Sequence, residues 1–182
     1  MILLFPLFLT AGTLMIPFVR WFGDHESAEK AIIASPQRWV SGHLLVAAAF
    51  GLGGVNVAQL VEVSWLAVLA AVGGGTLAAG LGADGIAPVV LHQHGLAPRL
   101  FLNGVSLLIP ATFAAGIILF GTAQVWMIVG VNQARLLPLD WGIAALLATI
   151  GFSVLPAIPS SWSLYATALL SWIIYLPLAI FL

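Results

Sequence analysis

Long stretches without a charged residue limit the architectures that this chain can adopt. Met1–Val19, Trp39–Val61 and Val63–Ala83 contain no Asp, Glu, Lys or Arg. Each run is close to the roughly 20 residues that a helix needs to cross a hydrocarbon core of about 30 Å. A soluble fold of 182 residues could not bury several such runs. We therefore expect an all-α integral membrane protein, with residues 1–182 forming one transmembrane helical domain.

The composition supports this class and excludes several others. Hydrophobic residues make up 62% of the chain and charged residues 6%, against about 25% charged residues in a typical soluble domain. The net charge is −1, and five Lys and Arg residues cannot build a patch that follows nucleic-acid phosphates. The chain has no cysteine, which excludes disulfides, thiolate metal sites and cysteine nucleophiles.

The first three predicted spans follow from the uncharged runs. Ile2–Phe22 lacks an A-x-A-like cleavage site, so we interpret it as a retained span rather than a signal peptide. The second span covers about Arg38–Leu60 and the third about Val63–Ile86, joined by a tight turn. Between the first and second spans, Ser27–Ala34 is expected to form a short surface helix that ends before Pro36.

The second half of the chain predicts three more spans. As one helix, Leu100–Ala134 would stretch about 52 Å, which is too long for one crossing and short for two. We place a fourth span at Phe101–Met127, followed by an apolar interfacial tail. The uncharged run Trp141–Leu182 fits two crossings around a turn at Pro156–Ser161. The prediction is a bundle of six transmembrane helices, with five as the alternative.

Tryptophan and basic residues indicate the ends and the orientation of the spans. Five tryptophans fall at predicted span ends, as an interfacial aromatic belt requires: Trp21, Trp39, Trp65, Trp141 and Trp162. Four basic residues lie in the connections after the first and third spans: Arg20, Lys30, Arg38 and Arg99. The opposite side has only Arg135, so the positive-inside rule predicts that both termini are extracytoplasmic.

The third span carries rows of small residues four apart, which would let neighbouring helices come close in lipid. We expect this helix to be the most buried of the bundle. The residues predicted to face other helices are Gly75, Ala79 and Gly82, and those predicted to face lipid are Leu69, Leu77 and Leu81.

Asp84 and His43 are the main candidates for a polar site. Both lie a turn or two inside the same predicted membrane boundary on adjacent antiparallel spans, and Asn103 and Ser106 enter the fourth span from that side. A carboxylate within a span costs about 2.5–3.5 kcal/mol, so Asp84 should be paired, protonated or facing water. Two interpretations remain open: a packing tie that binds nothing, and a pocket for an ion, proton or small solute.

The histidines raise the question of a cofactor. His92-Gln-His94 has the H-x-H form of some metal sites, provided that the backbone is extended there. A third ligand is available from His43, His25, Asp24 or Asp84. His43 could also be an axial ligand of haem or a pigment. The alternative for His92 and His94 is a solvated loop, and the first expectation is that no cofactor is bound.

Soluble-enzyme motifs are missing from the sequence: there is no G-x-S-x-G, no P-loop and no H-E-x-x-H. The entry to the second span resembles the P-x-R-W…H-L-L pattern of small prokaryotic multi-spanning membrane proteins of unassigned activity. The residues that carry this resemblance are Pro36, Arg38, Trp39, His43, Leu44 and Leu45. It implies a helical bundle in a prokaryotic plasma (inner) membrane and assigns no chemistry.

These observations leave three candidate functions. The first is a non-enzymatic membrane subunit, surrounded by lipid and packed against other membrane subunits or copies of itself. The second is a transporter or channel-like module with a polar pocket at Asp84 and His43. The third is a membrane protein that ligates haem, a pigment or a metal through His43, His92 or His94.

Overall fold

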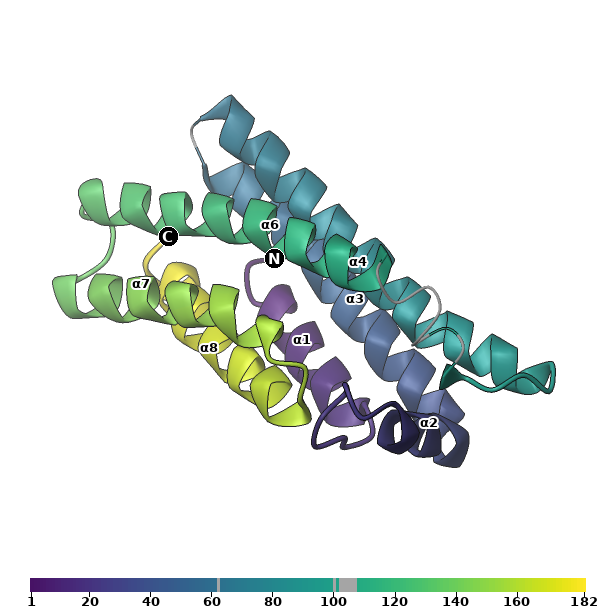
Figure 1. Cartoon of the computed structure of the whole chain (residues 1–182). Helices are drawn as coiled ribbons and strands as arrows, with labels where there is room; N and C mark the ends of the chain where they lie inside the picture. Colours follow the sequence, from purple (N-terminus) through teal and green to yellow (C-terminus); the bar gives the residue numbers. More distant parts are fainter. Residues whose placement is uncertain (62, 100, 102–107) are drawn as a thin grey trace.

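The structure, a computed structural model, describes every residue of the chain except 62, 100 and 102–107. The described residues form helices and connections, with no β-strand among them. The elements are α1 (Leu4–Met15), α2 (His25–Ala34), α3 (Pro36–Leu60), α4 (Ser64–Gln93), α6 (Leu108–Gln133), α7 (Leu139–Val154), the 3₁₀ turn η1 (Leu155–Ala157) and α8 (Ser161–Phe181) (Figure 1).

Four of the described helices, α3, α4, α6 and α8, are long and apolar enough to cross a membrane. The expectation of transmembrane helices is therefore confirmed. Helices α1 and α7 are also apolar, but they have only 12 and 16 residues. At 1.5 Å per residue they are about 18 Å and 24 Å long, less than the hydrocarbon thickness of about 30 Å.

Two predicted helix boundaries, both near a proline, differ from the structure. The first helix does not continue to Phe22 but ends at Met15, because Ile16 precedes Pro17 and adopts an extended ψ of 128°. The third predicted span does not end before Pro88: α4 passes through this proline and continues to Gln93. The residues predicted to form an apolar tail after Met127 continue the helix, since α6 extends to Gln133.

Other boundaries are as predicted. The short surface helix is present as α2, with Asp24 as its N-cap. The amide and the hydroxyl of Ser27 donate to the Asp24 carboxylate at 3.3 and 2.6 Å, and these bonds lower its pKa. The turn predicted at Pro156–Ser161 separates α7 from α8.

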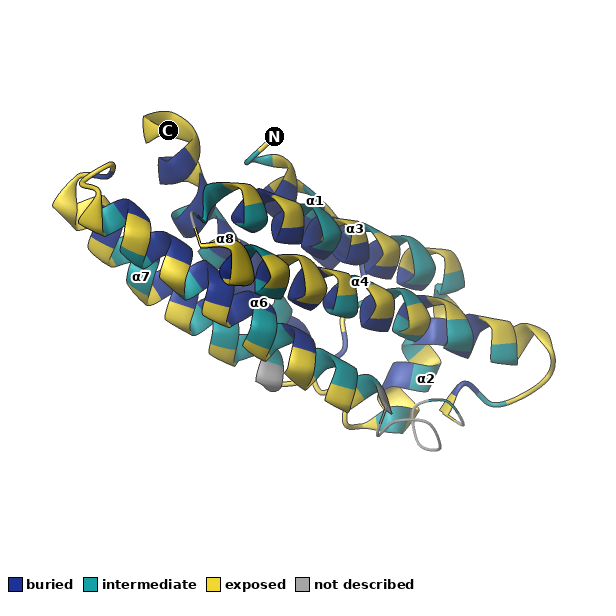
Figure 2. Ribbon diagram, turned by 90° about the horizontal axis from the view of Figure 1, so that it is seen from above, coloured by how far each residue is buried: buried dark blue, intermediate teal, exposed yellow. Residues whose placement is uncertain are grey.

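The bundle is built as a series of packed neighbours. Helices α3 and α4 form an antiparallel hairpin, α6 packs on α4, α1 packs on α3, and α8 packs on both α1 and α7 (Figure 1). Figure 2 shows buried positions along the sides where these helices meet and exposed positions on the outside. At the centre, the Phe5 ring contacts aromatic rings from four other helices: Phe50, Phe120, Phe152 and Tyr175.

Glycines set the short distance between α3 and its neighbours. A Cβ added to Gly74 of α4 would lie 2.6 Å from the carbonyl oxygen of Phe50 and 2.8 Å from the Cα of Gly54. Between α1 and α3, a Cβ on Gly12 would lie 2.7 Å from the carbonyl oxygen of Gly42. These backbones therefore touch at positions where no side chain fits, the packing expected of helices in lipid.

The predicted inner face of the third span is wrong. Gly75 and Ala79 are exposed and Gly82 is half-buried, whereas Leu77 and Leu81 lie inside at 1% and 7% exposure. Helix α4 is not the most buried span either, because 39% of its most apolar segment is buried against 56% for α3. Small residues do face α3, but they belong to the neighbouring row that contains Gly74.

An interfacial tryptophan belt requires rings that face outward, and most of the predicted members have such rings. Four of the five predicted members have outward-facing rings, with exposures of 45–65%: Trp21, Trp65, Trp141 and Trp162. Trp39 is different, because its side chain is only 1% exposed. Trp39 therefore packs inside the bundle rather than facing lipid, and its contacts are described with the candidate site.

We predict that Gly74→Ala destabilises the protein and that Gly75→Ala does not. The new methyl group at residue 74 would meet the backbone of α3, so the free energy of unfolding should fall by about 1–3 kcal/mol. At residue 75 nothing lies within 4 Å, and stability should stay the same or rise by up to about 1 kcal/mol. Reversible unfolding in mixed micelles measures both, and equal effects would contradict this packing.

Candidate functional site

His43 and Asp84 meet across the α3–α4 hairpin. Nε2 of His43 lies 3.4 Å from Oδ2 of Asp84. The imidazole is nearly enclosed, with 5% of its side-chain surface exposed, whereas the carboxylate retains 22%. The contact that the sequence predicts between these two side chains is therefore present, and the carboxylate is its more accessible member.

A backbone carbonyl fixes the protonation of the other ring nitrogen. Nδ1 of His43 lies 2.8 Å from the carbonyl oxygen of Trp39, one turn earlier in α3. A carbonyl oxygen only accepts hydrogen bonds, so this bond requires a proton on Nδ1. Nε2, which faces Asp84, then has a lone pair in the neutral ring or a second proton in the imidazolium.

The Trp39 side chain binds the same turn of α4. Its Nε1 donates a hydrogen bond of 3.1 Å to the backbone carbonyl of Asp84. In a regular helix this carbonyl accepts from the N–H four residues later, but residue 88 is a proline and has no N–H. The indole thus supplies the donor that Pro88 lacks, which matters because lipid offers no replacement.

Glycine and aromatic contacts hold the imidazole in place. A Cβ on Gly85 would lie 2.5 Å from the Cβ of His43, so only glycine allows the two helices this approach. On the other side, the Trp39 and His43 ring centroids are 4.5 Å apart with an angle of 33° between planes. Phe22 packs edge-on against Trp39 at 6.2 Å.

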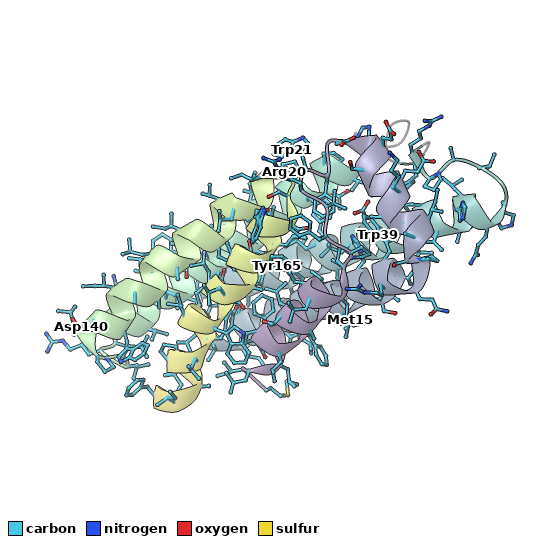
Figure 3. All side chains as sticks on the ribbon, turned by 90° about the horizontal axis from the view of Figure 1, so that it is seen from below. Met15, Arg20, Trp21, Trp39, Asp140 and Tyr165 are labelled. Carbon is cyan, nitrogen blue, oxygen red and sulfur yellow. The ribbon has the colours of Figure 1, made fainter. Side chains whose placement is uncertain are left out.

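The site lies near the end of the bundle where charged residues gather. Helix α2 packs on both α3 and α4 there, and Arg99 Nε is 3.8 Å from Oε2 of Glu29. Arg38 donates to the carbonyls of Leu14 and Met15 at the end of α1. Figure 3 shows Asp140 at the far end of the molecule from Trp39.

Two predicted members of the polar pocket, Asn103 and Ser106, lie outside the described residues. His92 and His94 are not brought to the pair: both are exposed at the end of α4. A metal site at these two histidines would need an extended backbone, and this prediction is wrong. Helix α4 continues through Gln93, and Nδ1 of His94 contacts the carbonyl of Val90. Among the described residues, no three His, Asp or Glu side chains form a metal-binding group.

Haem or pigment ligation by His43 does not fit the observed contacts. Nδ1 bonds to the Trp39 carbonyl and Nε2 faces the Asp84 carboxylate, so an axial ligand would have to break one of these contacts. With a 5% exposed side chain, the ring also lacks the open face that a flat macrocycle needs.

Sequence reasoning missed the roles of Trp39 and Gly85. For Trp39 a signal exists: an in-span proline leaves the carbonyl four residues earlier without its helical donor, and a donor on the adjacent helix must be found. It also missed the buried hydrogen bond of 3.1 Å that Gln124 donates to the hydroxyl of Tyr175. Neither residue is charged, and nothing in their sequence positions indicates that they meet.

The chain matches no protein-family model, no curated protein and no solved structure.

We predict that Pro88→Ala makes the Trp39 bond dispensable. In the natural sequence, Trp39→Phe should lower the free energy of unfolding by about 1–3 kcal/mol beyond its packing loss, because the Asp84 carbonyl loses its donor. Adding Pro88→Ala supplies a backbone N–H, so Trp39→Phe should then cost less. The packing loss is the same in both backgrounds, and a double-mutant cycle with no coupling would contradict the interpretation.

Proposed function

We propose that this protein is a non-enzymatic subunit that crosses a prokaryotic inner membrane six times and packs into a larger membrane assembly or a homo-oligomer. The observation that carries the proposal is an unpacked row of small residues on the outside of α4. The row consists of Ala71, Gly75, Ala79 and Ala83, and all four are exposed.

This outer row has the spacing that lets two helices approach closely in lipid, where packing rather than the hydrophobic effect drives association. Apart from the backbone of its own helix, no heavy atom lies within 4 Å of the position that a Cβ on Gly75 would occupy. An apolar groove of about 620 Å³ continues the same side toward the end of α4, lined by Gly82, Ala83 and Ala87 among others. A neighbouring transmembrane helix would bury this surface.

Six crossings are supported by how the two short helices are completed. After α1, the amide of Val19 donates to Oγ of Ser161 at 2.9 Å, and the amide of Ser161 donates to the Val19 carbonyl at 3.0 Å. The amide of Phe22 likewise donates to the carbonyl of Pro159. Non-helical backbone is tolerated at membrane depth when protein groups satisfy it. Helices α1 and α7 can therefore belong to full crossings.

We predict that Gly75→Leu weakens self-association or partner binding by about tenfold or more, because the side chain would hold a neighbouring helix away from α4. Gly130→Leu is the matched control, since Gly130 is exposed on α6 and also has no atom within 4 Å of its Cβ position. Cross-linking and pull-down from mild detergent measure the effect. Equal behaviour of the two variants would count against an interface on this face.

The charged end of the bundle supports an orientation. The connections that carry Arg20, Lys30, Arg38 and Arg99 meet at one end, as the contact between Arg99 and Glu29 indicates. Arg135 lies in the connection between α6 and α7. By the positive-inside rule the basic end is cytoplasmic.

We therefore predict that the N- and C-termini both face the extracytoplasmic side. A cysteine placed after Leu182 should react with a membrane-impermeant maleimide in intact cells, since the natural chain has no cysteine to compete. A cysteine at Lys30 should react only after the membrane is opened. The reverse pattern would invert the topology.

A second candidate, a transporter or channel-like module, is favoured by one observation. His43 and Asp84 form a titratable pair inside the hairpin, and its carboxylate is partly accessible. Membrane-embedded ionisable pairs of this kind often line ion or proton paths. Loss of proton- or cation-dependent activity in Asp84→Asn, with assembly unchanged, would favour this candidate over the first.

A further inference from the structure

We propose that His43 and Asp84 form a proton-binding site that holds one exchangeable proton between Nε2 and Oδ2. The inference is independent of the assembly proposed above. It follows from the two contacts of the imidazole, which assign different roles to its two nitrogens.

Nδ1 of His43 donates a hydrogen bond to the Trp39 carbonyl. Because this carbonyl accepts only, the proton on Nδ1 is committed to it at 2.8 Å and does not take part in exchange. The ring is further fixed by its tilted contact with the Trp39 ring and by the close approach of Gly85. A half-turn about the Cβ–Cγ bond would put Cδ2 and Cε1 where Nδ1 and Nε2 lie, and both the carbonyl bond and the contact with Asp84 would be lost.

Nε2 of His43 and Oδ2 of Asp84 are 3.4 Å apart, close enough to share one proton. One proton between them gives either an imidazolium facing a carboxylate or a neutral imidazole facing a carboxylic acid, and both forms are neutral as a pair. Releasing this proton leaves a neutral imidazole, a carboxylate and a proton in solution. The lone pair of Nε2 then faces the carboxylate.

The two side chains differ in their access to the surroundings, and this difference sets the route of proton exchange. The imidazole has 5% of its side-chain surface exposed and the carboxylate 22%, so a proton enters and leaves through Asp84. The pair lies toward the charged end of the bundle, where α2 packs on α3 and α4. This position places the site within reach of an interface rather than at the middle of the bilayer.

Other charged groups on the surrounding elements already have contacts or lie apart from the pair. On α2, Glu29 contacts Arg99 and Glu26 pairs with Lys30. On α3, Arg38 donates to carbonyls of α1, and on α4 the next titratable residue is His92, two turns later. His25 begins α2, while the sequences of α1 and α6 contain no titratable side chain. Among the described residues, the pair of His43 and Asp84 is therefore the ion pair that joins α3 to α4.

Nuclear magnetic resonance of the full chain in nanodiscs tests the proposal directly. With ¹⁵N-histidine and ¹³C-aspartate labels, Nδ1 of His43 should stay protonated at every pH, while Nε2 and the Asp84 carboxyl carbon should change together at one pH. His94 is the matched control, because its Nδ1 also contacts the carbonyl four residues earlier but its side chain is exposed. It should titrate without a matching aspartate signal.

Asp84→Asn provides the second measurement. Its amide keeps the size of the side chain and can donate to the Nε2 lone pair, so no exchangeable proton should remain between the two side chains. The variant should therefore take up about one proton fewer per chain than the natural protein. His43 carrying its neutral-state proton on Nε2, separate titration of Nε2 and Asp84, or unchanged titration of His43 in Asp84→Asn would each overturn the proposal.

Discussion

The close approach of helix backbones at glycine is the constraint on which the rest of this bundle depends. In lipid, helices gain nothing from hiding apolar surface, so they associate where shapes fit. Gly12 and Gly42 join α1 to α3, and Gly54 and Gly74 join α3 to α4. With these distances fixed, Phe5 can fill the centre and touch rings from four further helices. The first helix, although short, is thus part of the core.

The same close approach builds the polar site. At Gly85 the α3–α4 distance is small enough for two side chains of α3 to reach one residue of α4. Trp39 donates a hydrogen bond to the backbone carbonyl of Asp84, and His43 faces the Asp84 carboxylate. Pro88 explains why the carbonyl needs an outside donor. One turn of α4 therefore contains a carbonyl without its helical donor, the contact with the indole that replaces this donor, and the carboxylate that faces His43.

The two sides of α4 suit different tasks. Its inner side, with Gly74, Leu77 and Asp84, fixes the hairpin and carries the polar pair. Its outer side presents a row of small residues and an open apolar groove. An assembly through the outer side would leave the pair on the inner side intact. The subunit proposal and the proton site are consequently compatible.

The helical membrane class and the contact of His43 with Asp84 could both be predicted from the sequence. Both follow from local quantities: the length of apolar runs, and the depth of each residue from the end of its span. Packing between helices fixes three features that the sequence did not predict: the side of α4 that faces inward, the burial of Trp39, and the continuation of α4 beyond Pro88. Small residues surround much of α4, so its own sequence sets no preferred rotation, and only the surfaces of α3 and α6 select one.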